Sequence, residues 1–109
     1  MGAVAAASDF HARVLPALRE GLAQGAAESL VILFAEADYT HDGWRGAVVA
    51  SLAREAAPMR VNALAGGDAA ARAAALAWLA RAPGVTGQVL RLASDGASGG
   101  GLAKADAEG

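Results

Sequence analysis

Cysteine is absent from this 109-residue sequence, and lysine occurs only once, as Lys104. The absence of thiols excludes disulfides, thiolate metal sites and a cysteine nucleophile. The remaining positive charge comes from arginines that form no basic block, and the formal net charge is −2. Because nucleic-acid binding needs clustered lysine or arginine, we expect no nucleic-acid partner.

Long hydrophobic runs are also absent. No stretch approaches the roughly 20 apolar residues that a transmembrane helix requires, so we expect no membrane contact. Residues 1–7 are small and apolar, but they have no positive flank and are too few for a signal peptide. The sequence therefore predicts a cytoplasmic protein.

Large side chains are scarce for a sequence of this hydrophobic content. Hydrophobic residues make up 55% of the chain, but aromatic residues only 5%, and alanine supplies much of the rest. Alanine favours helices but buries little area, so the length fits one domain with a modest core. We assign residues 1–92 to this domain and residues 93–109, rich in glycine and alanine, to a flexible tail.

The segment at residues 59–67 organises the predicted fold. It reads Met-Arg-Val-Asn-Ala-Leu-Ala-Gly-Gly and follows Pro58. A short apolar run bounded by proline and glycine is typical of a buried parallel strand. Alanine-rich segments of helical character lie on both sides of it, which predicts helical crossovers and an α/β sheet.

Five further elements complete the predicted order of helix and strand, repeated three times. Ser8 and Asp68 are the expected N-caps of the first and third helices, and Pro16 predicts a kink in the first. Right-handed crossovers then give a three-stranded parallel sheet with helices on its faces, the first strand being covered on both sides. The expected helices span residues 9–24, 44–57 and 69–81, and the other strands span residues 30–34 and 88–92.

Two segments resemble the C-terminal half of the short-chain dehydrogenase/reductase family. Residues 60–67, Arg-Val-Asn-Ala-Leu-Ala-Gly-Gly, are similar to the family's R-V-N-x-V/I-x-P-G segment. Residues 85–92, beginning Val-Thr-Gly-Gln, are similar to the T-G-x-x-L/I segment on its last strand. The resemblance covers roughly residues 9–92 and implies a truncated, half-Rossmann-like, three-layer αβα fold with about three parallel strands.

The sequence departs from this family where the family's chemistry resides. No glycine-rich dinucleotide loop precedes the first helix, so we expect no cofactor. Tyr39 lies near the place of the family's Tyr-x-x-x-Lys pair, but Gly43 stands where the lysine would be. Residues 34–36, Phe-Ala-Glu, replace the catalytic serine region, and Gly66 replaces the proline of the P-G pair.

Tyr39, His41 and Asp42 form the only polar cluster suited to acid–base chemistry. They follow a predicted strand, and open α/β sheets bind ligands at the carboxyl ends of their strands. The alternative is a solvated loop that caps the next helix, and Tyr39 is therefore only a weak catalytic candidate.

Two other features have a structural and a functional interpretation. Residues 66–68, Gly-Gly-Asp, open a helix and could bind an anion, but the aspartate favours a capping role. Two histidines and scattered acids make no metal-ligand pattern, so we expect no metal and assign His11 to the surface.

The helix at residues 44–57 is the predicted interface. In the resembled family the equivalent helix packs against its twin across a subunit interface, and small side chains here would allow close approach. The unpaired edge of the strand at residues 30–34 is a second association surface. Ordinary packing against the sheet remains the alternative for the candidate interface residues, which are Trp44, Ala47, Val48, Ser51 and Leu52.

Three functional hypotheses follow. The first is a non-catalytic interaction subunit that forms a homodimer or pairs with a full-length dehydrogenase of the resembled family. The second is a residual NAD(P)-dependent oxidoreductase that takes its cofactor or missing residues from a partner. The third is a decaying reading frame that keeps a foldable half.

Overall fold

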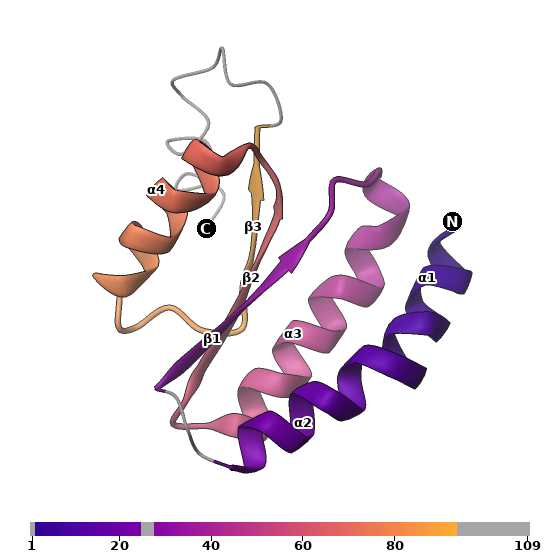
Figure 1. The fold of residues 1–109 in the computed structure, drawn as a ribbon, viewed down its shortest axis with the longest axis horizontal. Coiled ribbons are helices and arrows are strands. Elements are labelled where there is room, and N and C mark those ends of the chain that lie inside the picture. Colours follow the sequence, from indigo (N-terminus) through magenta and orange to yellow (C-terminus); the bar gives the residue numbers. More distant parts are fainter. Residues whose placement is uncertain (1, 25–27, 94–109) are drawn as a thin grey trace.

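The computed structural model describes residues 2–24 and 28–93 of the chain. Within these ranges the helices and strands follow the predicted order, with an N-terminal helical region, then strand, helix, strand, helix and strand (Figure 1). The predicted tail lies outside the described residues, apart from Ala93.

The N-terminal helical region has three parts. Helix α1 (Ala3–Asp9) leads into a π-helical segment, η1 (Phe10–Val14), which continues as α2 (Leu15–Ala23). The expected N-cap at Ser8 is wrong, because the alanine-rich start has high helix propensity and the helix begins at Ala3. The predicted disturbance at Pro16 is found as the π-helical segment just before it, where proline has no N–H for the helical ladder.

The three strands form one parallel sheet in the order β1-β2-β3. β1 (Ser29–Phe34) pairs along its whole length with β2 (Arg60–Gly66), and β3 (Val89–Leu92) pairs with the second half of β2. β1 was expected to be covered on both faces, but Leu33 is 58% exposed, so that expectation is wrong at this position. No described helix covers that end of the strand as the helices of a larger sheet would.

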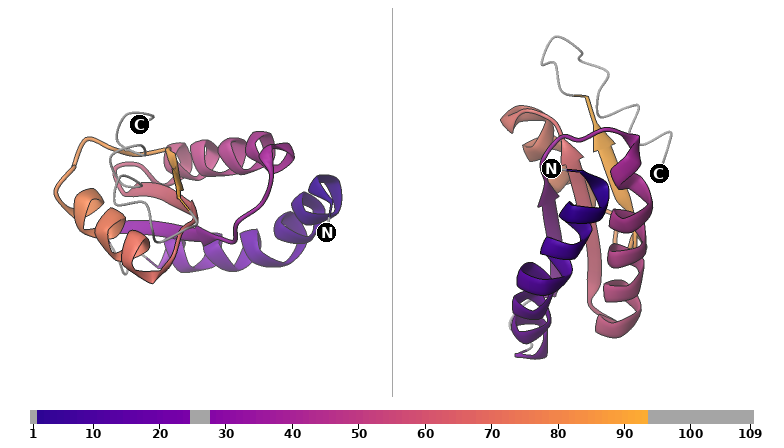
Figure 2. Two further views of the ribbon diagram at one scale, coloured as in Figure 1. Left: turned by 90° about the horizontal axis from the view of Figure 1, so that it is seen from above. Right: turned by 90° about the vertical axis from the view of Figure 1, so that its right-hand side faces the viewer.

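Helices cover the two faces of the sheet unequally, which confirms the three-layer αβα fold. The N-terminal helices and α3 (Asp42–Ala56) lie on one face, and α4 (Ala69–Ala80) lies on the other (Figures 1 and 2). The core between α3 and the sheet includes Val49, Leu52 and Val61, all fully buried. The smaller core beneath α4 is made by Leu64, Ala75, Leu79, Leu90 and Leu92.

The two crossovers have opposite hands. The strand order runs in one direction across the sheet, whereas α3 and α4 cover opposite faces. The β1–α3–β2 crossover is right-handed, as expected, but the β2–α4–β3 crossover has the rare left hand, so the second prediction is wrong. Placing α4 on the second face covers Leu64, Leu90 and Leu92, which a second helix beside α3 would leave open to water.

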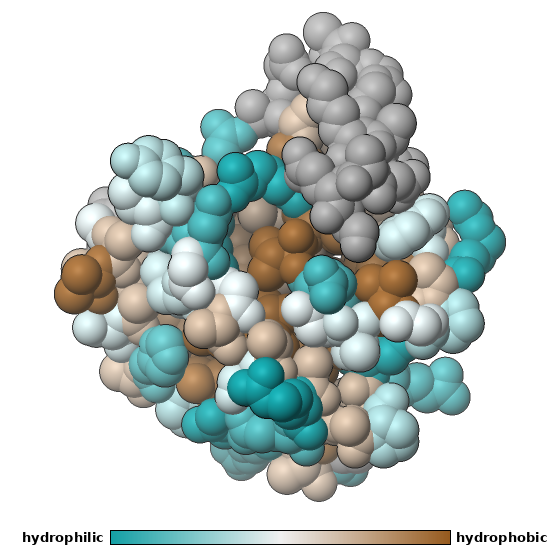
Figure 3. All heavy atoms as spheres, turned by 180° about the vertical axis from the view of Figure 1, so that it is seen from behind, coloured by the Kyte–Doolittle hydropathy of each residue, from teal (hydrophilic) through white to brown (hydrophobic). Residues whose placement is uncertain are grey.

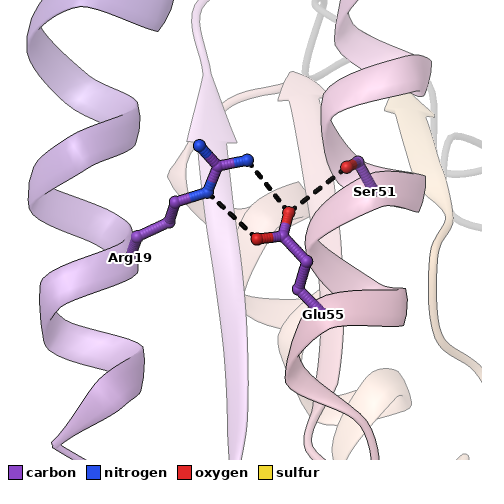
Figure 4. Close-up of polar contacts among 3 residues, drawn as sticks. All are labelled: Arg19, Ser51 and Glu55. Atoms are coloured by element: carbon purple, nitrogen blue, oxygen red, sulfur yellow. Dashed lines mark hydrogen bonds and ion pairs between the residues drawn. The ribbon is translucent and has the colours of Figure 1, made fainter.

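A bidentate ion pair joins the two helical segments that share a face. The Arg19 guanidinium on α2 donates to both oxygens of the Glu55 carboxylate on α3, at 3.1 and 3.0 Å. The Ser51 hydroxyl donates to the same carboxylate at 3.3 Å (Figure 4). These bonds lower the pKa of Glu55, with the Arg19 hydrogen bond as the largest cause.

No helix in the described ranges is long and apolar enough to cross a bilayer. On the face seen in Figure 3, hydrophobic side chains form small patches separated by hydrophilic ones.

Candidate functional site

A cleft of about 430 Å³ lies at the carboxyl ends of the strands. This volume falls within the roughly 300–1,000 Å³ typical of small-molecule sites, and the position is where open α/β sheets bind ligands. Charged side chains from three parts of the chain meet there. The lining residues are Glu36, Ala37, Asp38, Asp42, Arg45, Ala65, Gly66, Arg91 and Leu92.

A capped turn builds the wall of the cleft after β1. The Asp38 carboxylate accepts a hydrogen bond from the Thr40 backbone N–H at 3.0 Å and another from the Thr40 hydroxyl. Both bonds lower the pKa of Asp38, the hydroxyl bond more strongly. The resulting 3₁₀ turn, η2 (Tyr39–His41), runs directly into α3, so Asp42 and Arg45 in the first turn of α3 line the cleft.

Arg45 is a buried cation in this cleft, and its Nε has no hydrogen-bond partner among the described residues. Arg45 is only 8% exposed. Its Cζ lies 4.6 Å from the centroid of the Phe34 ring and 5.7 Å from the centroid of the Trp44 ring. These are cation–π distances. Among the described residues, Arg45 Nε has no hydrogen-bond partner and none of the ion pairs includes this side chain. Burial lowers the pKa of the guanidinium, and the charge of Asp42 acts in the opposite direction.

Sequence reasoning missed Arg45, although a signal was present. Arg45 precedes the buried Val48 and Val49 by three and four residues, so helical spacing puts it on the buried stripe of α3. An arginine on such a stripe needs either a partner or a ligand.

Arg91 closes the cleft from the side of β3. Its guanidinium forms an ion pair with the Asp42 carboxylate, and the side chains are 57% and 49% exposed. The pair links the last strand to the start of α3 and leaves Arg45 as the buried cation of the site.

The two motifs that carry the sequence resemblance run along β2 and into β3, and their first residues meet at the opposite end of the sheet from the cleft. Asn62 is 2% exposed, its amide nitrogen donates to the Val85 carbonyl at 3.0 Å, and its oxygen accepts from the Gln88 N–H at 3.1 Å. The Thr86 hydroxyl accepts from the Val61 N–H at 3.1 Å. The motifs therefore bind each other, and in this chain their contacts support the fold.

Arg60 adds a second set of bonds at this end. Its Nη1 donates to the carbonyls of Leu79 and Ala82, each at 3.0 Å. The same two carbonyls also accept from the backbone N–H groups of Ala82 and Val85, at 3.1 and 3.0 Å. Arg60 therefore adds a side-chain donor to the turns that follow α4.

A family model described as "Short chain dehydrogenase-like protein" matches residues 1–92. The chain belongs to this short chain dehydrogenase-like family. No curated protein and no solved structure matches the chain.

The candidate acid–base residues of this SDR-like chain do not converge. Tyr39 is 77% exposed and is not among the residues that line the cleft. His41 is buried, and its Nδ1 accepts a hydrogen bond from the Trp44 indole at 3.2 Å. Asp42 pairs with Arg91. The three side chains therefore lie in three different environments. Gly43, at the place of the family's lysine, lies within α3.

The charges of the described residues that line the cleft disfavour a dinucleotide. Its acidic side chains, Glu36, Asp38 and Asp42, outnumber its two arginines and would repel a pyrophosphate. Gly66, at the place of the family's proline, has a φ of 74°, which proline cannot adopt. The following helix is capped by Asp68, whose carboxylate accepts from the Ala71 N–H at 2.8 Å, so the predicted capping role is confirmed.

All five candidate interface residues line one groove, of about 480 Å³, between the N-terminal helices and α3. Val48 and Leu52 are buried in the core at its floor, so they present little surface to a partner. Ala47 is exposed, and Trp44 and Ser51 are half-buried. Trp44 also packs on the rings of Phe10 and Phe34, at centroid distances of 5.3 and 5.6 Å.

His11 is exposed, as predicted, and borders the same groove. Its Nδ1 lies 2.7 Å from the Ala7 carbonyl oxygen. No cluster of three or more possible metal ligands is found among residues 2–24 and 28–93.

Proposed function

We propose that this SDR-like chain is a non-catalytic subunit that associates with itself through α3 and the outer edge of β1. The same surface would serve for pairing with a full-length dehydrogenase of the family. The main support for the proposal is a contrast between two groups of residues. The motif residues that hold the fold together are present and bonded to one another, while the acid–base candidates point to different surroundings.

The surface of α3 supports association because of its small side chains. Ala47 is exposed and Ser51 half-buried beside Trp44, so a partner helix can approach the groove closely. Trp44, which lines this groove, is held by aromatic packing on Phe10 and Phe34.

The edge of β1 supplies a second argument. β1 pairs only with β2 among the described strands, and Leu33 is 58% exposed beside that edge. A hydrophobic strand edge with free backbone groups favours pairing with another chain. Such an edge would be covered in an assembly of two copies.

A pair of matched variants tests the role of α3. Ala47→Glu places a charge on the proposed interface, and Ala77→Glu places the same charge on an exposed site of α4. Sedimentation velocity is expected to show a loss of self-association for Ala47→Glu and native behaviour for Ala77→Glu. Equal behaviour of the two variants would contradict the assignment of the interface to α3.

The edge of β1 is tested separately with Leu33→Lys. Because Leu33 is already exposed, the substitution costs little core packing and introduces the charge that natural edge strands use to prevent pairing. We expect weaker self-association at unchanged melting temperature. Unchanged association would restrict the interface to α3.

The second candidate function is a residual NAD(P)-dependent oxidoreductase that works with residues or cofactor from a partner. The position of the cleft at the carboxyl ends of the strands is the observation that favours it, whereas the acidic lining opposes a pyrophosphate. It predicts that millimolar nicotinamide dinucleotide raises the melting temperature, because a ligand of the folded state stabilises that state. No shift for the chain, alone or with a dehydrogenase partner, would count against it.

A further inference from the structure

The guanidinium of Arg45 has a hydrogen-bond donor for which no described residue provides an acceptor. Arg45 is 8% exposed, it lines the cleft at the carboxyl ends of the strands, and its Nε is unpartnered among the described residues. A buried donor without an acceptor destabilises a protein.

The surroundings of the guanidinium indicate the shape of that acceptor. The Phe34 ring lies over it at 4.6 Å from Cζ to centroid, and the Trp44 ring is at 5.7 Å. Because the aromatic rings occupy a face of the guanidinium, its N–H donors are directed along its plane. A planar carboxylate matches such an arrangement with two parallel hydrogen bonds.

The charge of the cleft limits the charge of the ligand. Arg91 is already paired with Asp42, and Glu36 and Asp38 add two further carboxylates to the lining. The three carboxylates and two guanidinium groups of the lining sum to a net negative charge, and a dianion would meet about twice the net repulsion that a singly charged anion meets. The observations therefore favour a monoanion over a phosphate.

We propose that the cleft binds a small monocarboxylate, whose oxygens accept hydrogen bonds from the Arg45 guanidinium. This site is separate from the association surface proposed above and does not depend on it. The volume of about 430 Å³ is sufficient for a ligand of the size of an aromatic acid.

Benzoate and its neutral isostere benzamide test the proposal on the full chain, at ionic strength matched with sodium chloride. We expect benzoate to raise the melting temperature and to shift the Arg45 Nε–H resonance saturably. Benzamide is expected to bind at least about tenfold more weakly, since a hydrogen bond to a charged group is lost. Inorganic phosphate is expected to bind more weakly than benzoate.

Arg45→Met removes the donors but keeps most of the apolar stem, and Arg81→Met is the control at an exposed site. The benzoate response is expected to disappear in the first variant and to persist in the second. The proposal is overturned if benzoate gives no response, if benzamide or phosphate binds as well, or if Arg45→Met keeps the response. If Arg45→Met does not fold, the comparison of benzoate with benzamide on the native chain still decides.

Discussion

The side-chain oxygen of Asn62 accepts a hydrogen bond from the backbone N–H of Gln88 at 3.1 Å, across 26 residues of sequence. The amide nitrogen of the same side chain donates to the Val85 carbonyl. Asn62 thereby holds the connection that enters β3 and completes the left-handed crossover. In this chain the residues most similar to the dehydrogenase family act as an internal clamp.

Replacing Asn62 with alanine is expected to destabilise the fold by about 1–3 kcal/mol, because a buried side chain is removed and two part-buried backbone groups lose their partner. Urea unfolding followed by circular dichroism measures the change. Gln88→Ala is the control, since Asn62 bonds to the backbone of Gln88 and not to its side chain. That control is expected to stay within about 0.5 kcal/mol of the native chain. A comparable loss in both variants would refute the clamp.

Gly67 is expected to tolerate no side chain. Its φ is 81°, and a Cβ there would lie 2.8 Å from the Leu92 Cβ. Gly67→Ala should destabilise by about 1–3 kcal/mol, whereas Gly21→Ala, with open space in α2, should stabilise by up to about 1 kcal/mol. Thermal unfolding gives both values, and a stabilising Gly67→Ala would show that the turn after β2 is wrongly placed.

The Arg19–Glu55 pair should give a pH-dependent contribution to stability. The pKa of Glu55 is lowered from the usual 4.5, so the contribution is present above that pH and is lost as the pH falls through the lower folded-state value. The melting temperature of Glu55→Gln should therefore lie slightly below that of the native chain at neutral pH, and the difference should vanish in acid. Because the pair is exposed, molar salt should also reduce the difference. A difference that persists in acid would assign the effect to something other than the ion pair.

Restoring the family's Tyr-x-x-x-Lys pattern should not restore catalysis. Gly43→Lys places a lysine four residues after Tyr39, but Tyr39 is 77% exposed and lies outside the cleft lining. We expect no nicotinamide-dependent oxidation of alcohols and no cofactor-induced thermal shift in this variant. Cofactor-dependent turnover would show that Tyr39 reaches a productive position and would support the oxidoreductase hypothesis.

The strands were predictable because each is a short apolar run with a clear boundary. Proline and glycine delimit the segment that becomes β2, and the five large apolar residues from Leu30 to Phe34 form most of β1. The cap at Asp68 was equally local, since it depends on an aspartate placed just before a helix.

The candidate site was less predictable because it depends on contacts between distant residues. The burial of Arg45 requires Phe34 at the end of β1 to meet Trp44 on α3, a contact that no local pattern encodes. The hand of the second crossover likewise depends on which face of the sheet lacks cover. Tyr39 and His41 are close in sequence, but the 3₁₀ turn exposes the first and buries the second.

Light scattering on the purified full chain, over a range of concentrations and with or without nicotinamide dinucleotide, distinguishes the association hypothesis from the oxidoreductase hypothesis. We expect a particle larger than one chain whose mass and stability do not change when the cofactor is added. A chain that stays monomeric at every concentration and gains stability from the cofactor would contradict the association hypothesis, and the oxidoreductase hypothesis would then take its place.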